Sequence, residues 1–224
     1  MASMIDTIIF DAEGVVIDTE SIWDLGQQEF LQRRGCHYDR ERIKPLLTGR
    51  SLIEGVAVMQ REYGFGGDLG ALAQERLEII KELFAREIRF IEGFPEFFDH
   101  VREEYRTCIA TAMAPALLRS VDRRLGLSQL FHGQIFSLDD VDQRAKPDPA
   151  LFLYAAAQLG SRPEQCLVIE DAPLGIEAAK NAGMKCIGLA TTYKKHKLRA
   201  ADLVVNAYAE IDLTVLQRSS VAVL

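Results

Sequence analysis

Two acidic residues stand two positions apart directly after a short apolar run near the start of the chain. The run ends at Phe10, and the acids are Asp11 and Glu13, followed by Gly14. The carboxyl ends of the strands form the ligand-binding edge of an open α/β sheet, so a strand ending here presents the Asp11 carboxylate at that edge. One such acid can act as a nucleophile or bind a metal ion while its neighbour transfers a proton. A turn or helix cap is the alternative role for Asp11.

A hydroxyl group and a cation follow later apolar runs. Thr111 ends a run that begins at residue 106, so its hydroxyl and the nearby backbone N–H groups could hold a phosphate oxygen. An ordinary helix cap is the alternative for this threonine. Lys146 precedes Pro147, which favours an extended backbone beside a predicted helix start. A lysine placed there could neutralise a phosphate and two acids, whereas most isolated lysines are simply solvated.

A second pair of acids, Glu170 and Asp171, ends the apolar run at 167–169. Adjacent carboxylates at a strand tip repel each other unless a cation lies between them. Oxygen ligands of this kind suit Mg²⁺, and an acidic helix cap is the alternative. Polar residues at four strand tips of one sheet together predict a nucleophile, a proton carrier, a phosphate clamp and a metal site in one cleft.

Short apolar segments alternate with helical patterns along most of the chain. This alternation predicts the α/β class, with a doubly wound parallel sheet of Rossmann-like type covered by helices on both faces. Glycines at 126, 160 and 183 are expected to end three of the helices. The predicted strands are 5–10, 106–110, 131–136, 167–169, 186–189 and 203–205, and the predicted core helices are 117–125, 149–159 and 174–182.

Nearly a hundred residues separate the first two predicted strands, which is too long for a single crossover helix. Helical patterns cover 22–34, 51–63 and 68–89, and the second opens with Ser51 and Glu54 in capping-box spacing. We therefore expect an α-helical cap domain at 21–90 inserted into a core domain at 1–20 and 91–224. A cap of this kind can close over a substrate and exclude water.

Composition restricts the partners. The chain has 224 residues, 26 Lys and Arg against 33 Asp and Glu, and a formal net charge of −7, which argues against nucleic acid as a partner. It has no apolar run long enough to span a membrane and no signal-peptide pattern, so we expect a cytoplasmic protein. We also expect it to be a monomer or a weak homodimer. The cysteines Cys36, Cys108, Cys166 and Cys186 have no metal-site spacing and are interpreted as reduced residues, three of them in the core.

Four motifs occur in one order across most of the chain: FDAEGVVIDTE at 10–20, IATA at 109–112, KPDP at 146–149 and VIEDAPLGIEAAKNAGM at 168–184. In these motifs the chain resembles the haloacid dehalogenase superfamily, specifically the β-phosphoglucomutase-like and phosphoglycolate phosphatase-like branch with a helical cap. The resemblance implies a Mg²⁺-dependent phosphatase that acts on a small phosphorylated metabolite, such as a sugar phosphate or a phosphoglycolate-like compound.

The resemblance also implies a role for each site residue. Asp11 would attack phosphorus and form an aspartyl-phosphate. Thr111 and Lys146, with Ala112 beside them, would bind the transferring group. Mg²⁺ would be held by the Asp11 carboxylate, the Glu13 backbone carbonyl and Asp171, with Glu170 nearby. Charge neutralisation and positioning supply most of the catalysis in such phosphoryl transfers.

The chain departs from the family pattern at Glu13, where the family has an aspartate that protonates the leaving group and then activates water. The extra methylene moves the carboxyl group by about a bond length, a displacement that can cost about a hundredfold in rate. Three interpretations remain open: a working hydrolase with adjusted geometry, a slow phosphatase, and a catalytically impaired relative with a binding role.

Two further positions bear on the substrate. The loop after Thr111 is apolar, from Ala112 to Pro115, which disfavours the alternative of a sugar-phosphate mutase because mutases of the family carry polar residues there. Dehalogenation is disfavoured because that branch does not need the Glu170 and Asp171 pair. Arg50, in the predicted cap, could bind a second anionic group of the substrate or could be a solvated arginine.

Overall fold

The computed structural model describes residues 4–47, 50 and 52–214. The chain forms two compact units. One is Met1–Asp18 with Arg89–Leu224, which we call the sheet unit, and the other is Thr19–Ile88, which we call the helical unit. The interpretation of the helical unit as a substrate cap remains a proposal.

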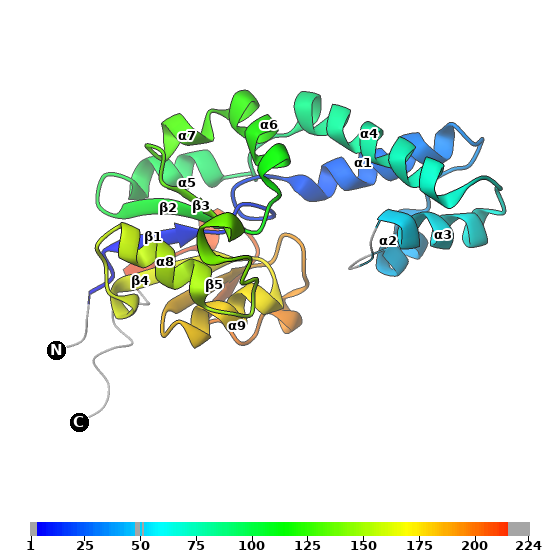
Figure 1. The fold of residues 1–224 in the computed structure, drawn as a ribbon. Helices are drawn as coiled ribbons and strands as arrows, with labels where there is room; N and C mark the ends of the chain where they lie inside the picture. The colour runs from blue at the N-terminus through cyan, green and yellow to red at the C-terminus, as the bar shows by residue number, and fades with distance from the viewer. Residues whose placement is uncertain (1–3, 48–49, 51, 215–224) are drawn as a thin grey trace. The chain divides into compact units, whose positions relative to one another are not determined.

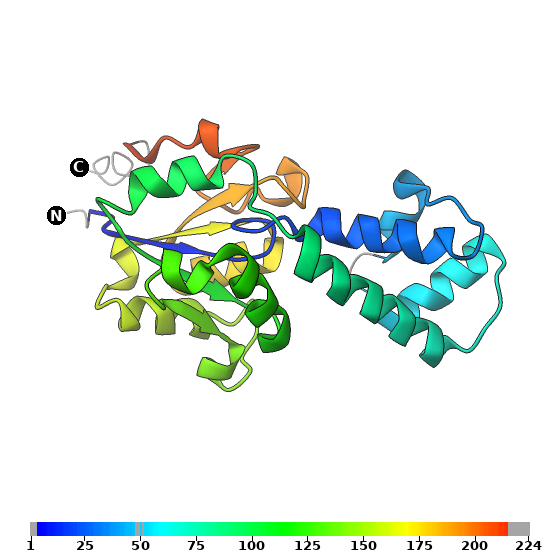
Figure 2. The same ribbon diagram turned by 90° about the horizontal axis from the view of Figure 1, so that it is seen from above.

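The sheet unit contains a six-stranded sheet whose strands are all parallel (Figures 1 and 2). Their order is β3-β2-β1-β4-β5-β6, so β1 lies between β2 and β4. This arrangement confirms the predicted doubly wound, Rossmann-like α/β class. The strands are β1 (Thr7–Phe10), β2 (Arg106–Thr111), β3 (Ile135–Ser137), β4 (Cys166–Glu170), β5 (Lys185–Leu189) and β6 (Leu203–Val205).

The predicted third strand at 131–136 is wrong over most of its length, because β3 contains only Ile135–Ser137. Phe131 instead follows a short helix, and the centroid of its ring lies 4.6 Å from that of Phe98, with the two rings tilted by 50°. The apolar side chain that suggested a strand therefore belongs to an aromatic cluster on one face of the sheet. The register Ile109↔Ile135 starts the pairing only after the turn has ended.

The two faces of the sheet carry different cores. Phe10 faces aromatic rings of Phe94, Phe98 and Phe131, with centroid distances between 5.7 and 5.9 Å. The preceding residue, Ile9, belongs to the other core, which is rich in alanine and cysteine side chains and includes residues of α8 and α9. The helices of this unit are α5 (Phe94–Val101), α6 (Pro115–Leu125), α7 (Leu127–Leu130), α8 (Ala150–Gln158) and α9 (Pro173–Asn181).

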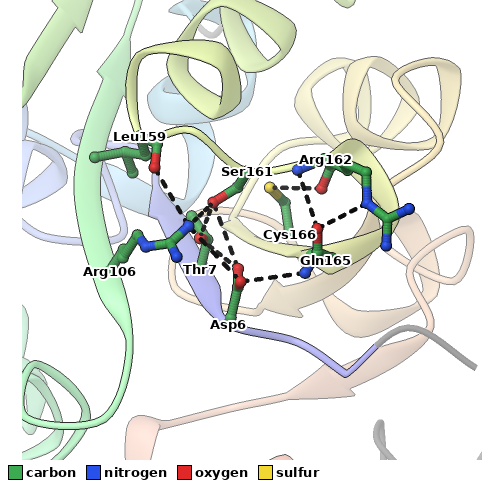
Figure 3. A network of polar contacts seen from close by, with 8 residues as sticks. All are labelled: Asp6, Thr7, Arg106, Leu159, Ser161, Arg162, Gln165 and Cys166. Carbon is green, nitrogen blue, oxygen red and sulfur yellow. Dashed lines mark hydrogen bonds and ion pairs between the residues drawn. The ribbon is translucent and has the colours of Figure 1, made fainter.

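Polar contacts join the amino ends of the central strands (Figure 3). The Thr7 and Ser161 hydroxyls lie 2.6 Å apart in a buried contact. Arg106 donates to the Ser161 hydroxyl at 2.8 Å, and Gln165 donates to Asp6 at 3.2 Å. These contacts join the starts of β1 and β2 to the segment before β4 at the edge opposite Asp11.

The helical unit contains α1 (Thr19–Gln32), α2 (Arg40–Leu47), α3 (Leu52–Tyr63) and α4 (Leu69–Glu87). The α2 helix was not predicted, because its sequence is highly charged and contains Pro45. Asp68 caps α4 by accepting the Ala71 N–H, whereas the predicted cap at Ser51 lies outside the described residues. Buried Arg76 joins three helices of this unit, since it donates to the Gln27 amide oxygen at 3.0 Å and to the Leu52 carbonyl at 3.4 Å.

Candidate active site

Asp11 lies at the switch point of the sheet. It follows β1, whose neighbours are β2 on one side and β4 on the other. Its backbone N–H donates to the Ile169 carbonyl at 3.0 Å, which extends the β1–β4 pairing by one residue. The crevice outside the carboxyl ends of strands at such a switch point is where open α/β sheets bind ligands. The side chain of Asp11 is therefore buried at the edge where a ligand is expected.

The loop that follows Asp11 is a tight turn held from several directions. Gly14 has a φ of 70°, and its N–H donates to the Ile17 carbonyl at 2.9 Å. The Ile17 N–H in turn donates to the Ala12 carbonyl at 2.9 Å. The buried Tyr208 hydroxyl donates to the Val15 carbonyl at 2.9 Å. The turn is thus fixed both by its own backbone and by a residue far along the chain.

Lys146 contacts two of the acids. Its Nζ lies 2.5 Å from Asp11 Oδ1 and 2.5 Å from Glu170 Oε1. The same ammonium group lies 5.1 Å from the centroid of the buried Phe152 ring on α8. Burial lowers the pKa of Lys146, but the two carboxylates outweigh burial and raise the pKa above its ordinary value. The lysine is therefore a permanent cation in the site.

Glu170 already uses both of its carboxylate oxygens. Oε1 accepts from Lys146, while Oε2 accepts the N–H groups of Asp171 and Ala172 at 2.9 Å each. A Cβ at Gly175 on α9 would lie 1.7 Å from Oε1, so only glycine leaves room for this carboxylate. Glu170 thus orients Lys146 and the turn after β4, and its expected place near a metal ion stays a prediction.

Asp11 and Asp171 carry more negative charge into the site than one lysine balances. Burial raises the pKa of Asp11 to about 7, with Lys146 opposing the rise and Glu170 and Glu13 adding to it. Burial also raises the pKa of Asp171, and the charges of Glu170 and Asp11 raise it further. Buried carboxylates that remain so crowded by charge fit a site for a divalent cation.

The donor set also fits Mg²⁺ in its number of side chains. Mg²⁺ is commonly held by one or two carboxylates together with water and substrate oxygens. Asp11 and Asp171 would be those two carboxylates.

Thr111 ends β2 and is buried. Its hydroxyl oxygen accepts the Met113 N–H at 3.0 Å, which folds the loop back over the strand tip. Ala112 is exposed at that tip, whereas Met113 is buried. The sheet register pairs Phe10 with Ile109, so the ends of β1 and β2 lie side by side.

Arg50 belongs to the helical unit and is exposed. Its Nε donates to the Leu46 carbonyl at 2.7 Å, close to the end of α2. Its expected contact with substrate stays a prediction. The structure thus brings Asp11, Lys146 and Glu170 into direct contact and places Asp171 and Glu13 within electrostatic range of Asp11.

Three residues beside the acids were missed by the sequence reasoning. Thr191 and Thr192 follow β5, and Tyr208 follows β6. Thr191 donates to the Gly14 carbonyl at 2.5 Å, and the Thr192 hydroxyl hydrogen-bonds Asp171. The signal that could have found the threonines is their position directly after a predicted strand, which is the position that identified Asp11 and Thr111.

The fold and the acidic site define an α/β protein of the Rossmann-like type with a buried aspartate at the tip of the first strand. A family model described as haloacid dehalogenase-like hydrolase matches residues 5–183. The chain belongs to this family, which confirms the resemblance found in its motifs. The relatives named as phosphatases also confirm the expected enzyme class, a phosphoric monoester hydrolase of this family.

Similar proteins include (DL)-glycerol-3-phosphatase 2 of Arabidopsis thaliana, which is 31% identical over 80% of this chain and 77% of that protein. The chloroplastic protein SUPPRESSOR OF QUENCHING 1 of the same plant is 32% identical over 88% of this chain, but the chain spans only 19% of that protein. A solved structure of a hydrolase of the family from Deinococcus radiodurans, with bound phosphate and sodium, is 26% identical with a TM-score of 0.82. That match covers 99% of this chain and all of that one.

Two other expectations concern residues away from the site. The four cysteines are free, and Cys108, Cys166 and Cys186 are buried, as expected for reduced core residues. In the described part of the chain, no helix is long and apolar enough to cross a membrane.

Proposed function

We propose that the protein is a Mg²⁺-dependent phosphatase that hydrolyses a small phosphomonoester, of the sugar phosphate or phosphoglycolate-like type, in the cytoplasm. The observation that carries the proposal is the contact of Lys146 Nζ with both Asp11 and Glu170 at the carboxyl edge of the sheet. In this contact the buried Asp11 carboxylate lies beside the Lys146 ammonium group, at the position where a phosphoryl group would bind.

The first step is attack of an Asp11 carboxylate oxygen on phosphorus. The O–P bond to the substrate breaks, and Glu13 gives a proton to the leaving oxygen. In the second step Glu13 takes a proton from water, the water oxygen attacks phosphorus, and the Asp11 O–P bond breaks to release inorganic phosphate. Lys146 and the Thr111 hydroxyl hold the phosphoryl oxygens in both steps.

Mg²⁺ would be held by Asp11, Asp171 and the Glu13 backbone carbonyl, and it would neutralise charge between the carboxylates and the phosphoryl group. Crowding of buried acids around one lysine supports this assignment. The exposed Ala112 and the helical unit, with Arg50, would contact the remainder of the substrate.

The experiment is hydrolysis of p-nitrophenyl phosphate and of a panel of phosphorylated metabolites that includes glycerol 3-phosphate and sugar 1-phosphates. Wild type is compared with Asp11→Asn, with Mg²⁺ and with EDTA. We expect release of inorganic phosphate that requires Mg²⁺ and is lost in the variant. Formation of an isomeric sugar phosphate instead of free phosphate would identify a mutase. Absence of turnover with every compound would identify a binding relative.

A further inference from the structure

The segment after β5 reaches the acidic site although none of the acids belongs to it. Thr191 is exposed at the surface, yet its Oγ1 donates to the Gly14 carbonyl at 2.5 Å. This bond joins residues separated by 177 positions in the chain. It spans β4, because β5 lies next to β4 and β4 lies next to β1. The turn that follows the nucleophile is therefore held by a side chain from two strands away.

Thr192, the next residue, also lies beside this turn. Its hydroxyl hydrogen-bonds the Asp171 carboxylate. A Cβ on Gly14 would lie 2.0 Å from Asp171 Oδ2 and 2.7 Å from Thr192 Oγ1. The two oxygen atoms thus converge on the bare Cα of Gly14. One threonine binds the backbone of this turn and the next binds the carboxylate that packs on it.

We propose that Thr191 and Thr192 are positioning residues for the cation site. Thr192 holds one carboxylate oxygen of Asp171, so that the orientation of the group is fixed before a divalent cation binds. Thr191 holds the Gly14 carbonyl and with it the orientation of the neighbouring Glu13 peptide. The inference rests on the proposed Mg²⁺-dependent function and assigns to this chain a part of the site that the acids alone do not supply.

The physical basis is preorganisation of the ligands. Hydrogen bonds from residues behind the ligands of a metal orient them, and loss of such a partner typically reduces metal affinity by about 10–100-fold. The Asp171 carboxylate is buried, so removing the Thr192 hydroxyl leaves few polar groups to replace it. The structural alternative is that these hydroxyls only stabilise the fold, which predicts a loss of stability without a change in affinity for the cation.

Thr7 provides a matched control. Its hydroxyl makes a buried contact of 2.6 Å with Ser161, but at the amino edge of the sheet, opposite the acids (Figure 3). Thr7→Val and Thr192→Val therefore remove the same group from the same protein with different neighbours. Thr192→Ser retains the hydroxyl and tests whether that group, and not the methyl group, is responsible.

The experiment measures binding of Mn²⁺ to the substrate-free protein by electron paramagnetic resonance, with Mg²⁺ calorimetry as a second measurement. Urea unfolding of each metal-free variant is recorded in parallel. We expect Thr192→Val to weaken Mn²⁺ binding about tenfold, Thr191→Val to weaken it less, and Thr192→Ser to remain near wild type. Thr7→Val should lower the midpoint of unfolding and leave Mn²⁺ binding unchanged.

Wild-type affinity for Mn²⁺ in Thr192→Val would overturn the inference and leave the proposed function intact. Equal weakening of Mn²⁺ binding in Thr7→Val and Thr192→Val would also overturn it, because the effect would then follow stability. Absence of saturable Mn²⁺ binding in wild type would remove the proposed metal-dependent function together with the inference.

Discussion

Lys146 Nζ lies 2.5 Å from Asp11 Oδ1, and 135 positions separate the two residues in the chain. The lysine side chain is 13% exposed and that of the aspartate 9%, so their charges interact with little solvent screening. Since Glu170 contacts the same ammonium group, one cation serves two buried acids. The position and the charge of the Asp11 carboxylate therefore depend on Lys146, a residue that precedes α8 and lies outside the strand of Asp11.

Removing this cation should affect both rate and stability. We expect Lys146→Met to reduce kcat by about a hundredfold to a thousandfold, because a preorganised charge at the phosphoryl group is lost. Stability of the metal-free protein at pH 8 should fall by about 3 kcal/mol, because buried carboxylates lose their partner. Steady-state kinetics and urea unfolding check the two effects. Lys180→Met, which removes a more exposed cation from Asp202, should leave kcat unchanged. An equal loss of rate in both variants would contradict this prediction.

Gly14 tests the close approach of Asp171. An alanine at this position would have to adopt a φ of about 70° with its Cβ against the Asp171 carboxylate. We expect Gly14→Ala to reduce activity by at least a hundredfold, on the scale that a displacement of about 1 Å can cause. Gly126→Ala is the control, because Gly126 has a φ of 68° and no atom near the added Cβ. That variant should lose only about 1 kcal/mol of stability and retain activity. Similar activities for the two alanine variants would contradict the expected clash between the added Cβ at position 14 and the Asp171 carboxylate.

Shortening the side chain at Glu13 should reduce kcat less than removing its carboxyl group. We expect Glu13→Asp to stay within about tenfold of wild-type kcat, because the acid can still exchange a proton. Glu13→Ala should reduce kcat by about a hundredfold or more and allow the phosphoenzyme to accumulate. Rapid-quench kinetics with p-nitrophenyl phosphate separate the burst of nitrophenol from steady turnover. A large gain in kcat with Glu13→Asp would show that the wild-type enzyme is impaired.

Asp202, which lies away from the site, should make the stability of the fold depend on pH. Partial burial raises the pKa of Asp202, but bonds from Lys180 and from the Cys186 N–H outweigh it and lower the pKa below its ordinary value. Because the folded-state pKa is the lower one, the stabilisation is present above the unfolded value of 3.8 and is lost as the pH falls through the folded value. Asp202→Asn should therefore cost about 1–2 kcal/mol at pH 7. Urea unfolding at a series of pH values should show the difference shrinking below about pH 4; a difference independent of pH would contradict the assignment.

The parts of the fold that follow from local pattern were predicted from the sequence. The strands before Asp11 and Glu170 are apolar runs buried on both faces, a pattern that local composition reveals. The helix-ending glycines at 126, 160 and 183 have positive φ as expected. The failures have tertiary causes. The Phe131 side chain packs against other aromatic rings, and the local sequence pattern does not distinguish such a buried residue after a helix from a residue in a strand.

The candidate site was predictable as a set of residues but not as a set of contacts. Position after a strand identified Asp11, Thr111 and Asp171. Nothing local indicates that Glu170 would use both oxygens within the protein, because that depends on the approach of α9 at Gly175. The bond from Thr191 to Gly14 likewise depends on the order of the strands, which the sequence does not state.

The bonds of Glu170 have a consequence for how the enzyme can change during evolution. They form a continuous chain from the backbone amides before α9, through the Glu170 carboxylate and Lys146, to Asp11. We expect a small displacement of α9 to shift Asp11 through these bonds. Selection for altered turnover should consequently recover substitutions along the buried side of α9, around Ile176 and Ala179, as well as substitutions in the site itself.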